Sequence, residues 1–201
     1  MGALSKLDAV NRILRAAGEY PVSTLAVTGS NDVTMAVQTL DETTMHVQLG
    51  GLNCNTVETE VLPNSTGRIL VEDTVISVDT IGTDASRNIV QRGRNPTYLF
   101  DVDNNTDIFD IGTPVKVRIV SNLPFESLPT AEQFQVTDYA ARMYQMATVG
   151  EIAQDKLLSE ISMLSRAAGR ASNIRSLDAS FMNNKKSPWP WIAARRTQGP
   201  F

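Results

Sequence analysis

Residue types that usually carry catalysis or bind metal are scarce in this sequence. The chain contains one histidine, His46, and one cysteine, Cys54. Zinc sites are built from clusters of histidine and cysteine, so these two residues do not supply enough ligands. A cysteine and histidine nucleophile pair is conceivable, but His46 lies in a stretch with helical periodicity, where a lone histidine is more often exposed or simply hydrogen-bonded. We therefore expect no zinc centre and no catalytic pair.

The acidic segment that begins at Asp101 is the candidate ion site. Asp101, Asp103 and Asn105 reproduce the D-x-D-x-N start of a calcium loop. Thr106 stands where that loop needs a glycine, and Gly112 stands where it needs a bidentate glutamate. The pattern favours a polar turn between two strands, with a calcium loop as the alternative. We expect no bound metal and no cofactor.

Motifs of common enzyme classes are also missing. The sequence has no G-x-S-x-G, G-x-x-x-x-G-K-[ST] or G-x-G-x-x-G motif, which removes the best support for a serine hydrolase or a nucleotide hydrolase. A pair of carboxylates for glycoside cleavage can be drawn from the 22 acidic residues, but the sequence does not place two of them in one cleft. We expect a protein that is not an enzyme, with a glycan hydrolase as the alternative.

Charge is distributed unevenly along the 201 residues. The net charge is -4, yet residues 166–201 hold seven basic residues and one acidic residue. Both tryptophans of the chain lie in this basic end, in the stretch SPWPWIAARR at residues 187–196. Twelve of the 22 acids lie between Asp41 and Asp110. An acidic body that ends in a basic, tryptophan-bearing segment is typical of a contact segment.

The residue types of this end allow several interpretations. Nucleic-acid binding would use the bases for phosphates and the tryptophans for stacking, but the sequence pI of about 5.0 disfavours a dedicated nucleic-acid binder. A membrane-surface helix is interrupted by Pro188 and Pro190. Docking on a partner protein fits best, because Pro-Trp-Pro-Trp favours an extended chain and tryptophan and arginine are common interface anchors. A tail folded onto its own core is the remaining alternative. The predicted contact residues are Lys185, Lys186, Trp189, Trp191, Arg195 and Arg196.

Helical periodicity marks both ends of the chain. Residues 5–18 form one apolar face, with a capping box at Ser5 and Asp8 and a terminating glycine at Gly18. A second helix is expected from Asn31 or Asp32 to Gly50. After Pro129, one further helix is expected to bury a stripe of Val136, Ala140, Met143 and Ala147. The last helix carries a near-heptad seam long enough to pack along another helix, formed by Ala153, Leu157, Ile161, Leu164, Ala168 and Ala171.

The middle of the chain follows the period of strands. In VKVRIV, Val115, Val117 and Ile119 alternate with Lys116 and Arg118, as in a half-buried strand. We therefore predict an α+β protein in which helices from both ends form a bundle, an antiparallel β-rich lobe is inserted, and an extended tail follows. The expected boundaries are 1–52 for the first helices, 53–121 for the insert, 122–178 for the last helices and 179–201 for the tail. No membrane span is expected, because the longest uncharged stretch, 43–57, is short and polar.

Several stretches resemble the tail tubular protein A family, the head-to-tail adaptors of short-tailed phages. LDAVNRILRAAGEYPVSTL at residues 7–25 is similar to the family's opening helix and G-E-x-P-V-S-T-L loop. EVLPNSTGRILVEDTVISVD at 60–79 and VKVRIVSNLPFESLP at 115–129 follow in the family's order. The chain departs from the family at GGLNCN, where an aromatic is usual, and at Ser127, where an acid is common.

The resemblance implies a structural role in the virion tail. Such adaptors form a ring, expected to be a dodecamer, between the portal protein and the tail nozzle, tail tubular protein B. Genome DNA passes through the lumen without specific binding, and an acidic lumen wall would give its phosphates nothing to hold. We further predict that residues 188–196 are disordered in the free chain and dock in a groove of the portal or of a neighbouring adaptor. A tail-associated glycan hydrolase and a DNA-binding protein are the alternatives.

Overall fold

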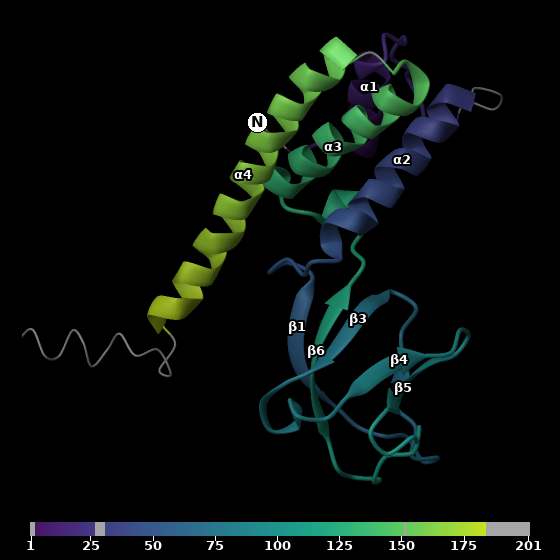
Figure 1. The fold of residues 1–201 in the computed structure, drawn as a ribbon, viewed down its shortest axis with the longest axis vertical. Helices are drawn as coiled ribbons and strands as arrows, with labels where there is room; N and C mark the ends of the chain where they lie inside the picture. The colour runs from purple at the N-terminus through teal and green to yellow at the C-terminus, as the bar shows by residue number, and fades with distance from the viewer. Residues whose placement is uncertain (1–2, 27–30, 151, 184–201) are drawn as a thin grey trace, which may run out of the picture.

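The computed structural model describes residues 3–26, 31–150 and 152–183. It has two lobes, a helical bundle and a β-rich lobe, and the chain enters the second lobe after α2 and returns before α3 (Figure 1). This arrangement confirms the predicted α+β class. The bundle contains α1 (Lys6–Ala16), α2 (Asn31–Gln48), α3 (Thr130–Thr148) and α4 (Ile152–Asn183). The other elements are β1 (Thr56–Val61), β2 (Leu70–Val71), β3 (Val75–Thr80), η1 (Gly82–Asp84), β4 (Ile89–Arg92), β5 (Thr97–Asp101), β6 (Val115–Ser121) and η2 (Phe125–Ser127).

The first helix begins and ends at the residues that its sequence predicts. The hydroxyl of Ser5 accepts a hydrogen bond from the backbone N–H of Asp8 at 3.1 Å, which satisfies one free donor of the first turn. Gly18 has a φ of 82°, a left-handed conformation that ends a helix without the penalty a side chain would bring. The face between these caps buries Val10 and Leu14 almost completely.

The third helix lies at the centre of the bundle and contacts the other three helices (Figure 1). Val136 and Ala140 are fully buried, as predicted, but the rest of the predicted stripe is wrong because Met143 and Ala147 are exposed. A helix packed on three neighbours buries more than one face, so its core positions extend to Tyr144. The bundle core consists of Ala9, Val10, Ile13, Leu14, Val33, Ala36, Leu40, Phe125, Leu128, Val136, Ala140, Ala141 and Tyr144.

The fourth helix packs on α3 through small residues instead of through its predicted seam. Leu157 and Leu164 of that seam are 59% and 72% exposed, whereas Ser165 and Gly169 are buried. Small side chains let two helix backbones approach closely, and this closer contact determines which face of α4 turns inward. The helix continues to Asn183, whereas the sequence placed the end of the helices at residue 178 and the start of the tail at residue 179.

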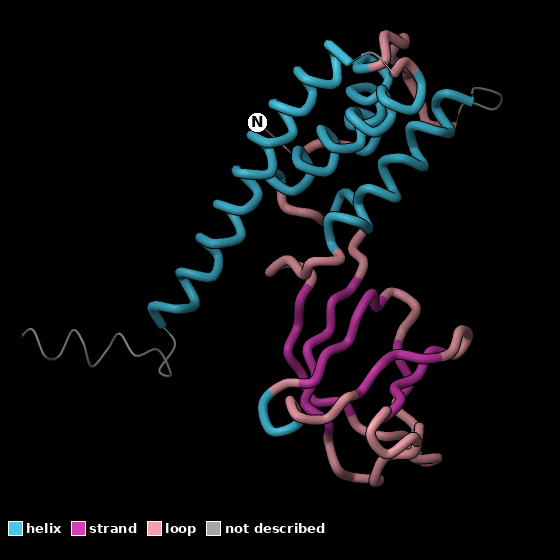
Figure 2. The backbone as a smooth tube through the Cα atoms, in the orientation of Figure 1, coloured by secondary structure: helices cyan, strands magenta, loops and turns pink. Residues whose placement is uncertain are grey.

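The β-rich lobe is built from two three-stranded antiparallel sheets (Figure 2). Their strand orders are β1-β6-β3 and β2-β5-β4. The predicted alternation in β6 is confirmed, since Val115 and Val117 are buried while Arg118 is exposed and pairs with Glu58 of β1 at 2.8 Å. The lobe has a core of its own, formed by Ile69, Ile89, Leu99, Phe109, Val115 and Val117.

Buried amides join the two lobes where the chain crosses between them. Asn55, 2% exposed, donates from Nδ2 to the carbonyl of Ser121 at 3.0 Å and accepts from the N–H of Leu52 at 2.7 Å. Gln48, the last residue of α2, donates from Nε2 to Oδ1 of Asn122 at 3.1 Å. These bonds satisfy backbone groups that leave regular structure at the crossing, and they fix the position of the β-rich lobe on the bundle.

Candidate assembly surfaces

The predicted contact residues of the C-terminal segment lie outside the described part of the chain. Lys185, Lys186, Trp189, Trp191, Arg195 and Arg196 all follow Asn183, the last residue of α4.

The two residues considered for nucleophilic chemistry have different neighbours. His46 is exposed on α2, and its ring stacks on Tyr139 of α3 with 6.2 Å between the ring centroids. The thiol of Cys54 lies in the turn before β1, where partial burial and then the charge of Glu132 raise its pKa. A raised pKa keeps the thiol protonated, which is the opposite of an activated nucleophile.

The loop after Asp101 is held together by its own hydrogen bonds. Asp101 is 1% exposed and accepts from the N–H and the side-chain amide of Asn104, each at 3.0 Å, and from Nη2 of Arg87 at 3.1 Å. Burial opposes ionisation of Asp101, but these donors outweigh it and lower its pKa. Asp103 accepts instead from the N–H of Asn88 at 3.0 Å. This geometry is that of a polar turn closed by an ion pair, the interpretation that the sequence favours.

The described residues offer neither a metal-binding cluster nor a membrane-spanning helix. No group of three or more histidine, cysteine, aspartate or glutamate side chains within them could hold a metal ion. In the same part of the chain, no helix has both the length and the apolar character needed to cross a bilayer.

The predicted seam of α4 forms an exposed apolar surface. Three of its six predicted residues, Leu157, Ile161 and Leu164, are 59%, 37% and 72% exposed. Ile161 also borders a hollow that α4 forms with α1 and α3, lined by Arg12 and Asp138 among others. We call Leu157, Ile161 and Leu164 the α4 seam. It has the spacing of a helix-packing face and is not covered by the described part of the chain.

A network of polar groups holds α4 in place beside this seam. Arg12 of α1 donates to Oδ1 of Asp138 on α3 at 2.9 Å. The hydroxyl of Ser165 on α4 donates to the other oxygen of the same carboxylate. Asp138 is 8% exposed, so one carboxylate with little access to water receives donors from two other helices. Satisfied networks of this kind fix a single arrangement of the helices that share them.

A second surface, of mixed polarity, lies between α2 and α3. It is a groove of about 380 Å³ lined by Thr39, Glu42, Thr43, His46, Tyr139, Met143 and Ala147. On α3, Tyr139 is two residues from Ala141, which lines the hollow beside the α4 seam. Residues two apart in an α-helix lie on roughly opposite sides, so the groove and the seam lie on opposite sides of α3.

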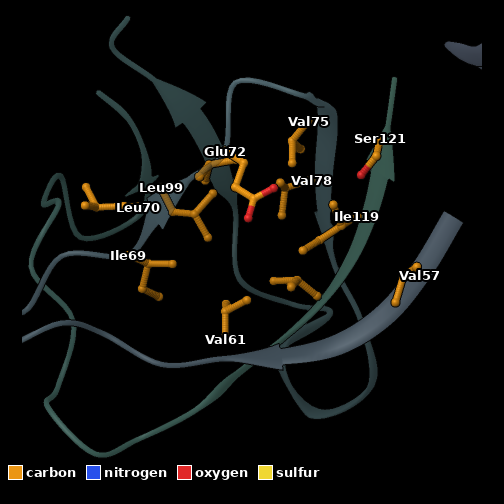
Figure 3. Close-up of a pocket in the computed structure, with 12 residues that line it drawn as sticks. Val57, Val61, Ile69, Leu70, Glu72, Val75, Val78, Leu99, Ile119 and Ser121 are labelled. Atoms are coloured by element: carbon orange, nitrogen blue, oxygen red, sulfur yellow. The ribbon is translucent and has the colours of Figure 1, made fainter. Parts of the chain in front are cut away.

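A third surface is a pocket between the two sheets of the β-rich lobe. Its volume is about 320 Å³, and Figure 3 shows its walls, which are mostly valine, leucine and isoleucine side chains. Two lining residues are polar, Glu72 and Ser121, and the carboxylate of Glu72 points in among the apolar side chains (Figure 3). Val57 and Leu70 line the pocket and are 58% and 55% exposed.

A buried carboxyl group lies in the first turn of α3. Glu132 is 3% exposed, and its Oε2 has no hydrogen-bond partner among the described residues. Burial raises its pKa, because removing a carboxylate from water disfavours the charged form. Glu132 is not recognisable from the sequence as a special residue, since a glutamate in a first helical turn is ordinary.

The residues that position α4 also went unrecognised in the sequence. Ser162, Ser165 and Gly169 recur at spacings of three and four, and this small-residue pattern could have indicated the contact face. The larger apolar residues nearby form a more hydrophobic stripe, so the sequence favoured that stripe as the contact face. Gln48 gave no local signal, since its partners are far away in sequence.

Comparison with known proteins identifies the family. The sequence profile of the family described as Tail tubular protein matches residues 7–176. The chain is also 30% identical over 147 residues to Tail tubular protein A of Klebsiella phage KP34, an alignment that covers 73% of this chain and 75% of the relative. The chain therefore belongs to the tail tubular protein family, and it is a structural protein of the virion tail.

Proposed function

We propose that the protein is a head-to-tail adaptor that assembles as a ring, joining the portal protein to the tail nozzle, tail tubular protein B. Twelve subunits are the expected number, and genome DNA crosses the lumen without specific binding. Membership of the tail tubular protein family and the similarity to Tail tubular protein A of the Klebsiella phage support this role.

The observation that carries the proposal is the pair of different surfaces on opposite sides of the bundle, one apolar and one of mixed polarity. The α4 seam lies on one side of α3, and the groove between α2 and α3 lies on the other. A contact that joins two different surfaces of identical subunits repeats from copy to copy and closes a ring when the rotation permits. Contacts of this type would cover both surfaces at every subunit.

Charge supports the proposed passage of DNA. The lobe that contains Glu58, Glu60, Glu72, Asp73 and Asp79 exposes all five of these acids. Arg118 pairs with Glu58 and Lys116 pairs with Glu60, so Glu72, Asp73 and Asp79 are the carboxylates of this set without an ion pair among the described residues. A lumen lined by an excess of carboxylates repels phosphates and lets the duplex slide. A strongly basic lumen in an imaged ring would refute this part of the proposal.

Cosedimentation with the portal protein of the same genome, followed by imaging of the particles, tests the adaptor role. The unaltered chain is expected to form a ring on the portal. Leu157→Lys with Leu164→Lys is expected to abolish the ring, because two charges enter an apolar contact. Met163→Lys is the matched control: Met163 is 66% exposed on the same helix, six residues from Leu157 and on another face.

The outcomes separate the alternatives. If the Leu157→Lys, Leu164→Lys double variant forms the ring as well as the Met163→Lys control does, the seam is not an assembly surface. Absence of any complex with the portal would refute the adaptor role itself. Reducing-sugar release and salt-dependent DNA retention then test the glycan hydrolase and DNA-binding interpretations.

A further inference from the structure

The pocket between the two sheets has no occupant in the described chain, and its chemistry is selective. We propose that it binds residues 184–201 of an adjoining copy of this protein, with an indole of Trp189 or Trp191 inserted between the sheets. The inference rests on the proposed ring, because the ring places a second copy beside the first. It selects the neighbouring adaptor, and not the portal, as the acceptor of the C-terminal segment.

The walls of the pocket match the needs of a tryptophan side chain. Val61, Val78, Leu99 and Val117 supply apolar surface on several sides. An indole buries 150–250 Å² of mostly apolar area, yet its N–H needs an acceptor once it leaves water. The carboxylate of Glu72, which points into the pocket, is such an acceptor (Figure 3). Few acceptors, Glu72 and the hydroxyl of Ser121, among aliphatic walls favour an indole over a purely aliphatic side chain.

Charge complements this shape. The C-terminal segment after Asn183 contains four basic side chains and no acidic one. Glu72 lines the pocket, Asp73 follows it in the same turn, and both are exposed. Lysines or arginines that flank an inserted tryptophan would therefore meet carboxylates at the rim. Pairs of this kind orient and accelerate docking more than they add to its affinity.

The length of the segment and the place where it starts favour a neighbouring copy. The last turns of α4 lie well apart from the sheets of the same molecule (Figure 1). Eighteen residues follow Asn183, and an extended chain of that length spans about 60 Å. This reach allows the segment to cross to an adjoining subunit. A contact that links each subunit to the next adds avidity to the ring.

Disulfide trapping tests the contact in the assembled ring. Cys54 is the sole cysteine of the chain, so Cys54→Ser gives a background without thiols. Leu70→Cys is combined there with Trp191→Cys in the full chain, bound to the portal and treated with copper phenanthroline. The matched control combines Trp191→Cys with Ile111→Cys, because Ile111 is 68% exposed and does not line the pocket. Neither Leu70 nor Ile111 is buried, so both variants are expected to fold.

The proposal expects covalent dimers and larger oligomers from the Leu70 pair and far fewer from the Ile111 pair. Crosslinks confined to single chains would overturn the assignment to an adjoining copy. A ring without crosslinks from the Leu70 pair would overturn the pocket contact and leave the adaptor role intact. Crosslinked oligomers without portal binding would support the contact and refute the adaptor role.

A second measurement does not depend on cysteine geometry. Both tryptophans of the chain lie in the proposed segment, so intrinsic tryptophan emission of the full-length protein reports on that segment alone. Emission is expected to shift to shorter wavelength as protein concentration rises and oligomers form. Val57→Lys with Leu70→Lys is expected to prevent this shift, whereas Ile111→Lys preserves it. A shift that the pocket variant leaves unchanged would contradict the proposal. Single Trp189→Phe and Trp191→Phe variants identify the inserted indole.

Discussion

The side-chain amide of Gln48 forms a paired hydrogen bond with the backbone of Leu123. Its Nε2 donates to the carbonyl oxygen of Leu123 at 2.9 Å, and its Oε1 accepts from the N–H of Leu123 at 2.8 Å. Gln48 ends the last helix before the β-rich lobe, and Leu123 follows the last strand of that lobe. One fully buried side chain therefore links the two chain segments that connect the lobes, the segment after α2 and the segment after β6. The relative position of the lobes depends on this amide.

Replacing Gln48 by methionine keeps the side chain about the same length but leaves the backbone groups of Leu123 without their partner. We expect Gln48→Met to lower the free energy of unfolding by about 2–3 kcal/mol, because buried polar groups become unsatisfied. Gln38→Met, at an exposed position of the same helix, is the control and is expected to be nearly neutral. Urea unfolding of both variants measures the difference. Equal stability of the two would show that the paired bond contributes nothing.

The ion pair between Asp101 and Arg87 predicts a dependence of stability on acid. The folded-state pKa of Asp101 lies below its ordinary value of 3.8, so the carboxylate stabilises the fold at neutral pH. This stabilisation is complete above that ordinary value and is lost as the pH falls through the lower folded-state pKa. We expect Asp101→Asn to lower the free energy of unfolding by about 2–3 kcal/mol at pH 7.

Urea unfolding of Asp101→Asn and of the unaltered protein at lower pH tests whether the charge of Asp101 causes this stabilisation. The difference between the unaltered protein and Asp101→Asn is expected to shrink as the pH falls below 3.8. Asp110→Asn, at an exposed position in the same loop region, serves as the control and is expected to show little effect. A difference for Asp101→Asn that stays constant from pH 7 to pH 3 would contradict a role for its charge.

Glu132 predicts the opposite dependence on pH. Its folded-state pKa is raised by burial, so the folded state binds the proton more tightly than the unfolded chain. The resulting stabilisation is present below the ordinary value of 4.5 and is lost as the pH rises through the folded-state pKa. Glu132→Gln removes this loss, so the variant is expected to gain stability relative to the unaltered protein between pH 4.5 and pH 8.

The thiol of Cys54 provides an independent readout of Glu132. Partial burial and then the charge of Glu132 raise the pKa of Cys54, so Glu132→Gln is expected to lower that pKa and to speed thiol alkylation near pH 8. The change should be modest, since burial is the larger cause. Glu126→Gln, at an exposed position in η2, is the control. An alkylation rate that does not respond to Glu132→Gln would place its charge outside the reach of the thiol.

Gly169 of α4 lies close to the side chain of Gln135 on α3. A Cβ atom there would lie 2.3 Å from Oε1 of Gln135, so that amide would have to move. Valine adds branched methyl groups as well, and we expect Gly169→Val to lower the free energy of unfolding by about 1–2 kcal/mol. Ala168→Val, at the adjacent exposed position, controls for the helix propensity of valine. Thermal unfolding of the pair measures the difference, and identical transitions would refute the close contact.

Local patterns were sufficient to predict the elements and their class. The caps of α1 depend on a serine, an aspartate and a glycine that lie within one helix of each other. The alternation in β6 follows from the side-chain period of a strand. These features depend on neighbours along the chain, so sequence spacing contains the information. The boundary at residue 178 and the contact residues after Asn183 stay predictions.

The partners of each face were harder to predict, because a hydrophobic stripe does not specify what covers it. The α4 seam has the spacing of a packing face, and this spacing predicted contact with another helix. In the structure the small face of Ser165 and Gly169 occupies that contact, since a closer approach of the backbones and the Asp138 network stabilise it. The seam then stays exposed. In the proposed ring, a neighbouring subunit would cover it.

The sequence by itself determined the class of fold, the order of helices and strands, and the family, because these follow from periodicity, caps and motifs along the chain. The tertiary structure alone decided which helix faces meet, where the pocket between the sheets lies, and how Gln48 joins the lobes. Those features depend on groups such as Gln48 and Leu123 that are 75 residues apart. Their energies arise from shape and hydrogen-bond geometry after folding, which local spacing does not encode.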